Sequence, residues 1–196
     1  RAWVYDSALG VWDQVADNDT DADNIAGTLG NQITFPSGMP IKVQSVTYTG
    51  TSSAGINKQW TKVGNLTIDT GQPYNTNSKF LIKAHVCHSL TGSGTLSLRF
   101  YDGDTAITAA LGDARGSTTR STFGPGHWST GPSTYPIHTS SMEFLYSPNS
   151  AVGMTLSVKG TDTGTYVHYY NRSNNGNTSE WQTSPISTFT VMEIAG

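Results

Sequence analysis

Apolar and polar residues alternate along most of the chain after Pro40, and this period of two is typical of half-buried β-strands. The alternation is clearest in 79–88, where Phe80, Ile82 and Val86 fall on one face. Turn residues separate nearly all of the alternating segments, which are 41–49, 59–69, 79–88, 94–103, 141–147, 152–160, 164–171 and 187–194. The pattern predicts an all-β fold, a jelly-roll-like antiparallel β-sandwich of about eight strands.

The first 36 residues do not share this pattern. They hold two aromatic clusters followed by an acidic, turn-rich run, and no long alternating stretch. Pro36, Gly38 and Pro40 then interrupt the chain, as is typical of a domain boundary. We therefore predict an N-terminal arm or attachment segment over 1–36, with one or two short strands, and a β-sandwich domain over 37–196.

Two polar connections of the predicted sandwich contain aromatic residues. The longer one, 110–140, is rich in Gly, Ser, Thr and Pro, and connections of such length are usually functional. Aromatic faces among Asn, Ser and Thr suit stacking against sugars, although packing between subunits is the somewhat favoured interpretation. The candidate ligand- or receptor-binding residues in the two connections are Trp128, Tyr135, Asn174 and Trp181.

The composition argues against several classes of partner. Charged residues make up 13% of the chain, about half the usual share, and the net charge is −3. Nucleic-acid binding rests on clustered Lys and Arg, so we expect no nucleic-acid partner. The sequence holds no run of about 18 apolar residues, so we expect no membrane insertion. Cys87 is the only cysteine, which excludes an internal disulfide.

Two short motifs resemble metal-binding patterns, but neither is complete. Residues 17–24 place oxygen ligands at alternating positions, as a calcium loop does, yet lack its glycine and its final glutamate. His85, Cys87 and His88 offer softer ligands, but no second cysteine pair completes a tetrahedral site, and a metal here would need ligands from several subunits on a symmetry axis. We therefore expect a solvated acidic turn and a half-buried strand end, with no metal and no cofactor.

Residues suited to catalysis are sparse. The sequence has no GxSxG motif, and beyond residue 40 Glu143 and Glu193 are the carboxylates that lie inside predicted strands. Two facing carboxylates would suit glycoside hydrolysis, but a structural role is the favoured interpretation. We predict that the protein is not an enzyme.

Glu193 raises a separate question, because it shares a face of the last predicted strand with Phe189. A carboxylate that faces a core costs roughly several kcal/mol unless it is paired. The expected partners are Arg99, Arg172 or Lys83 of the same or a neighbouring subunit, or backbone N–H groups. We predict that Glu193 and Arg172 serve strand register and assembly rather than catalysis.

A series of short motifs also runs along residues 35–196. In order they are "FPSGMPIKVQSVTYTGTSS", "SKFLI", "RFYDGDTAI", "GDARGSTTRSTFG", "SMEFLYSPNS", "YYNRSNN" and "STFTVMEIAG". Their order and spacing resemble the C-terminal β-sandwich domain of bacteriophage virion fibre proteins, chiefly tail fibres of marine and cyanobacterial phages. The resemblance carries over no catalytic residue.

The resemblance implies a virion structural protein, assembled as a homotrimer, with a receptor-binding-type domain for attachment to the host cell surface. We expect a place on the surface of the extracellular particle, contacts between the arm and other virion proteins, and a host-surface glycan as ligand. A low-charge chain rich in aromatic residues and Thr also favours burial against identical neighbours. The alternatives are a capsid decoration or head-fibre protein bound to the virion surface and, less favoured, a carbohydrate-active enzyme.

Overall fold

The computed structural model describes residues 2–6, 11–15, 35–90, 95–124, 137–162, 164, 166–173 and 183–196. The chain divides into two compact units, Arg1–Phe35 and Pro36–Gly196. In the first unit, β1 (Ala2–Asp6) and β2 (Val11–Val15) pair antiparallel over five residues each. Two short strands therefore lie in the segment where one or two were expected.

The second unit contains the strands of the sandwich. They are β3 (Pro40–Tyr48), β4 (Ser52–Ser53), β5 (Thr61–Asp69), β6 (Lys79–Leu90), β7 (Leu96–Asp102), β8 (Thr105–Ala106), β9 (His138–Tyr146), β10 (Thr155–Asp162), β11 (His168–Tyr170) and β12 (Ser187–Ile194). One 3₁₀ turn, η2 (Thr108–Ala110), is the only helical element of the described residues, and no helix among them is long and apolar enough to cross a membrane. The predicted all-β fold is confirmed.

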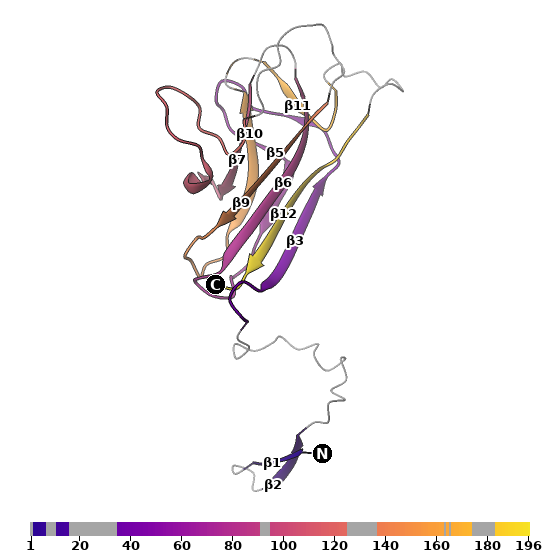
Figure 1. Cartoon of the computed structure of the whole chain (residues 1–196). Coiled ribbons are helices and arrows are strands. Elements are labelled where there is room, and N and C mark those ends of the chain that lie inside the picture. The colour runs from indigo at the N-terminus through magenta and orange to yellow at the C-terminus, as the bar shows by residue number, and fades with distance from the viewer. Residues whose placement is uncertain are drawn as a thin grey trace. The chain divides into compact units, whose positions relative to one another are not determined.

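Eight of these strands form nested antiparallel pairs, in which the first strand pairs with the last and the pairing continues inward along the chain. β3 pairs with β12, β5 with β10, β6 with β9 and β7 with β8, all antiparallel. Two further pairings, β12 with β6 and β10 with β7, join these pairs into a front sheet, β3-β12-β6-β9, and a back sheet, β5-β10-β7-β8 (Figure 1). At one end the front sheet is extended by β11 and β4. This strand order is that of a jelly roll, as predicted.

The predicted segments differ from the observed strands in one respect. Seven of the eight become principal strands of the jelly roll, whereas 164–171 contains β11, which has three residues. The eighth principal strand is β8, which follows the turn at Gly103 and has two residues. A strand of two residues cannot show an alternating period, so the sequence pattern did not reveal it.

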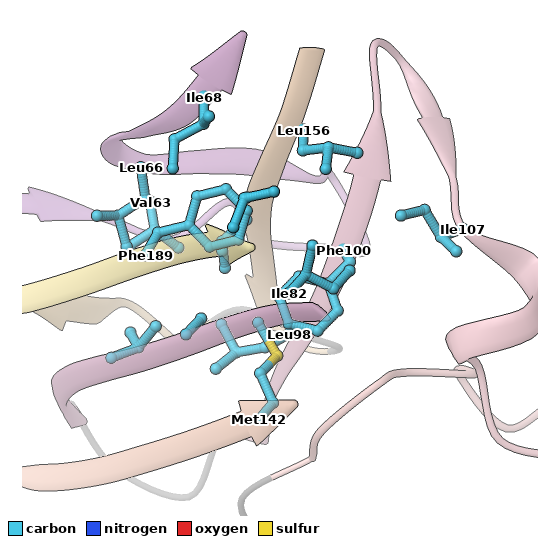
Figure 2. Packing of buried hydrophobic residues seen from close by; sticks show 14 of the residues in the cluster. Val63, Leu66, Ile68, Ile82, Leu98, Phe100, Ile107, Met142, Leu156 and Phe189 are labelled. Carbon is cyan, nitrogen blue, oxygen red and sulfur yellow. The ribbon is translucent and has the colours of Figure 1, made fainter. Parts of the chain in front are cut away.

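The core fills the space between the two sheets. Phe80, Ile82 and Val86 of β6 are buried on the face predicted for them, in one cluster with residues of the back sheet. Figure 2 shows Ile82 in this cluster with Leu98 and Leu156. The rings of Phe100 and Phe189 stack across the sandwich with centroids 6.1 Å apart. Burial of these side chains supplies most of the drive to bring the sheets together, at roughly 1.5–3 kcal/mol each.

The two ends of the sandwich differ. At one end, called the base, the backbone N–H of Gly38 donates to the carbonyl of Ala195 at 2.8 Å, and the N–H of Ala195 donates to the carbonyl of Met39 at 2.9 Å. The start and the finish of this unit are therefore joined at the base. At the other end, called the loop end, β6 finishes while β9 and β12 begin (Figure 1).

Candidate functional site

The four residues proposed to bind a ligand, Trp128, Tyr135, Asn174 and Trp181, lie outside the described residues. The strand ends that flank their segments, at His138, Tyr170 and Ser187, belong to the loop end. Their candidate role therefore stays a prediction.

Arg172, expected to serve assembly, lies at the loop end. Its guanidinium carbon is 3.8 Å from the centroid of the Tyr169 ring, which places it in a cation–π contact. Asn171, the residue before it, is buried, and its amide donates to the carbonyls of Tyr48 (2.7 Å) and Gly50 (3.0 Å). Asn171 thus fastens the chain beside Arg172 to the end of β3.

Glu193 is buried, with 4% of its surface exposed, on the core face predicted for it. Its Oε1 accepts a hydrogen bond of 2.6 Å from the backbone N–H of Tyr74, in the connection between β5 and β6. Of the partners expected for this carboxylate, the backbone N–H is therefore the one that the chain provides. Two of the expected cations have other partners, since Arg99 lies over Trp60 and Lys83 forms an ion pair with Glu143.

The two strand carboxylates do not form a catalytic pair. Glu143 lies on the outer face of β9, where it is 2.7 Å from Lys83 Nζ, whereas Glu193 faces the core from β12. Because they lie on opposite faces of the front sheet, they cannot flank one glycosidic bond.

The end of β6 is more deeply buried than the half-buried strand end that was expected. His85 is exposed and its Nδ1 lies 3.1 Å from Ser141 Oγ, but Cys87 and His88 are both only 4% exposed. Across the described ranges, no group of three or more His, Cys, Asp or Glu residues is arranged to hold a metal ion. His88 instead belongs to a buried polar cluster between the sheets.

That cluster contains two separate histidine contacts. His88 Nε2 lies 2.8 Å from Ser140 Oγ, and His168 Nε2 donates to Asp162 Oδ2 at 2.6 Å. The rings of His88 and His168 are 6.5 Å apart, and His138 is 5.9 Å from His88. His88 contacts a serine and His168 a carboxylate, so neither of these two histidines joins a serine to a carboxylate. Ser140 is also fully buried, so this pair of contacts lacks the geometry of a nucleophilic triad.

Burial keeps both of these imidazoles neutral at neutral pH. It lowers the pKa of His88 to about 3, with smaller contributions from the positive charges that His168 and His138 would carry. Burial also lowers the pKa of His168, although its contact with Asp162 acts in the opposite direction. Sequence analysis singled out His88 but not His168 or Asp162. The three residues lie on three different strands, β6, β11 and β10, and their spacing in the sequence matches no known motif.

The outer face of the front sheet carries an apolar row that crosses all four strands. Val43 pairs with Met192, Met192 with Leu81, and Leu81 with Leu145, so the four side chains lie side by side in one register. Val43 is 57% and Leu145 47% exposed, and Met192 and Leu81 are half-buried. Large apolar side chains gathered on an outer face mark an interaction surface.

One of the two rows beside the apolar row carries no net charge. This row contains Ser45, Thr190 and the Lys83–Glu143 ion pair, and a shallow groove of about 380 Å³ lies over β6 there. The charges of Lys83 and Glu143 cancel, so the face suits contact with a protein surface of the same low charge. Register alone brings the apolar row together, which is why sequence analysis did not find it.

Comparison with known proteins gives no family. No family model matches the chain, and no curated protein matches it. Among solved structures, it is similar to chains of infectious bursal disease virus: the Gx strain (13% identity, TM-score 0.39, covering 82% of this chain and 37% of that chain), the T13 viral particle (11%, 0.38, 87% and 40%) and the VP2 subviral particle (10%, 0.37, 87% and 42%). The chain spans about two fifths of the length of these proteins. Likeness at this level shows neither a shared family nor a shared function.

Proposed function

We propose that this chain is a bacteriophage virion structural protein whose sandwich is a receptor-binding-type domain. In this proposal it forms a homotrimer on the particle surface, attaches to the host cell surface and acts without catalytic turnover. Its arm contacts other virion proteins, and its ligand is a host-surface glycan.

The observation that carries the proposal is the polarity of the sandwich. The segment that follows the arm enters at the base, where Gly38 and Ala195 are hydrogen-bonded, and the strand ends that flank the candidate ligand residues lie at the loop end. A domain tethered at one end presents the opposite end outward. This arrangement suits a protein that is anchored on a particle and meets a cell with its loops.

The motifs behind the fibre resemblance fall at positions that the fold itself requires. Gly38 of "FPSG" has φ +87° and Gly103 of "RFYDGDTAI" has φ +56°, a conformation that favours glycine, and the second forms the β7–β8 turn. Asn171 of "YYNRSNN" has φ +56° and fastens the chain to β3 through its amide. The motifs therefore support a shared fold, and the proposal of a shared function rests on their order and spacing.

The apolar row of the front sheet supports the homotrimer. Three copies that turn this face toward a common axis would remove Val43, Met192, Leu81 and Leu145 from water and close a ring. Each fully buried side chain of this kind contributes roughly 1.5–3 kcal/mol. In the row beside it the charges of Lys83 and Glu143 cancel, so that row imposes no net repulsion between identical copies.

The proposal is tested with the full chain and with phage particles. Fluorescently labelled protein should bind host cells, and antibody against it should label virions. Labelling at fibre tips supports attachment, whereas labelling over the whole head surface would favour a decoration protein. Absence of both cell binding and virion labelling would overturn the proposal. Breakdown of host polysaccharide by wild type but not by Glu143→Gln would replace it with an enzymatic function.

A further inference from the structure

Three cations lie in one row across the outer face of the back sheet. Lys159 of β10 pairs in register with Lys62 of β5 on one side and with Arg99 of β7 on the other. Like charges directly opposite one another destabilise a sheet. In the described part of the chain, the only carboxylate within ion-pair distance of this row is Asp104, 3.0 Å from Lys159 Nζ. We call these three residues the cationic row.

Aromatic rings hold the cationic row in place. The Arg99 guanidinium lies 3.9 Å from the centroid of the Trp60 ring, and Lys159 Nζ lies 4.3 Å from that of Tyr101. The two rings are themselves 6.2 Å apart. Arg99 Nε also donates to the carbonyl of Arg120 at 2.6 Å, which fixes the plane of the guanidinium. Preorganised donors of this kind lose little side-chain entropy when they bind an anion.

The row differs in depth along its length. Lys159 and Tyr101 are buried, Arg99 and Trp60 are half-buried, and Lys62 is exposed. A ligand would therefore contact Lys62, Arg99 and Trp60 directly, with the charge of Lys159 beneath them. Asp104 is fully exposed, so an external anion can displace it from Lys159 at little cost.

A local irregularity of β5 creates the row. The register between β5 and β10 shifts between Ser157 and Lys159, and this shift places Lys62 opposite Lys159. Gly64, within the irregular part of β5, has φ +51°, and a Cβ there would lie 2.4 Å from the Tyr48 ring. A larger residue would clash, so this glycine is required for the register that aligns the three cations.

We propose that the outer face of the back sheet binds an acidic polysaccharide. Carboxylate or sulfate groups would accept hydrogen bonds from Lys62 and Arg99, and the Trp60–Arg99 stack would contact the sugar rings. Charge-assisted hydrogen bonds to a planar guanidinium are among the stronger polar contacts. The choice of a polysaccharide as the anion rests on the proposed function, in which the ligand of the protein is a host-surface glycan. The net charge of −3 speaks against a nucleic acid, whose binding requires a broader basic surface.

The test uses the full chain and calorimetric titration with three polymers: dextran sulfate, polygalacturonate and neutral dextran. We expect binding to at least one acidic polymer and none to neutral dextran. Lys62→Glu should weaken acidic-polymer binding about tenfold, since it replaces an attraction by a repulsion. Lys79→Glu is the matched control, because Lys79 is also an exposed strand lysine and gives the same net charge, but it lies on β6 of the front sheet. It should bind as wild type does.

A second variant, Arg99→Gln, tests the preorganised member of the row. It should weaken binding by tenfold or more, about the worth of a charged hydrogen bond. Near-ultraviolet circular dichroism and sedimentation should show that each variant keeps the wild-type fold and mass. If Arg99→Gln is misfolded, the Lys62→Glu and Lys79→Glu pair still decides the question.

Three results would overturn the inference. They are no binding to either acidic polymer, equal losses in Lys62→Glu and Lys79→Glu, and tighter binding to duplex DNA than to the acidic polymers. These titrations need neither host nor virion. Lys62-dependent polymer binding without cell or virion association would therefore contradict the proposed function alone, and cell binding unaffected by Lys62→Glu and Arg99→Gln would contradict the inference alone.

Discussion

Two faces of the sandwich point away from its core, one from each sheet, and they differ in charge. The front face has the apolar row from Val43 to Leu145, beside a Lys83–Glu143 pair whose charges cancel. The back face has the cationic row with one exposed carboxylate. Because side chains alternate along a strand, the core constrains only the side chains that point inward, and those that point outward can differ between the two sheets. The two sheets can therefore share one core while one face suits identical copies and the other an anionic ligand.

The largest effect is expected on the front face. Leu145→Glu should weaken self-association by at least about a hundredfold, because it removes an apolar side chain that the proposed contact would bury and brings a charge into that contact. Sedimentation velocity over a range of concentrations measures the change. Val152→Glu is the matched control, since Val152 is 72% exposed outside the row. If both variants associate as wild type does, the apolar row is not the contact between copies.

Substitution of two glutamates distinguishes a side chain that faces the core, Glu193, from one on the outer face, Glu143. Glu193→Ala should cost about 2–3 kcal/mol of unfolding free energy, because it deprives the Tyr74 N–H of its acceptor and empties a buried position. Glu143→Ala removes an exposed ion pair and should cost under about 1 kcal/mol. Urea unfolding of both variants gives the two values. A loss for Glu143→Ala as large as that for Glu193→Ala would contradict the assignment of inner and outer faces.

Acid should weaken the core beneath both faces. The pKa of His88 is about 3 in the fold, below its unfolded value of 6.5, so the unfolded chain binds more protons between these two pH values. Stability is therefore complete above about pH 6.5 and falls as the pH drops toward 3, by at most roughly 1.4 kcal/mol per pH unit for this group. His168 should add to the same trend.

Thermal unfolding at a series of pH values measures this slope. His88→Gln should make the slope smaller, because it removes the buried imidazole whose pKa is lowered. The groups that face His88 are His138, His168 and, through His168, Asp162. A wild-type stability that stays constant between pH 6.5 and 4 would contradict this account of the cluster.

Salt should produce the smallest effect and should act differently on the two faces. Raising salt from about 50 mM to about 500 mM should weaken acidic-polymer binding several-fold, because the cationic row is partly exposed and is screened. Association through the apolar row should stay the same or become slightly stronger. Calorimetric titration measures the polymer binding and sedimentation measures the self-association, both in the same buffers. Equal sensitivity of both to salt would show that the faces do not differ as described.

Sequence alone predicts the parts of this molecule that depend on local pattern. The strands and their inward residues, such as Phe80 and Ile82, follow from alternation, and the need of Glu193 for a partner follows from its place among them. The identity of that partner does not follow from the sequence, because the fold of the connection between β5 and β6 is what brings the Tyr74 N–H to Glu193. The apolar row and the cationic row likewise depend on register between distant strands, which a single sequence does not specify. The His168–Asp162 contact joins residues only six apart, but it depends on the path of the connection between β10 and β11.

Sedimentation equilibrium of the unmodified full chain tests the assembly claim most directly. The account predicts a species of three 21.0 kDa chains at micromolar concentration, which Leu145→Glu converts to folded single chains. A single 21.0 kDa species with a well-folded β spectrum at tens of micromolar would contradict it.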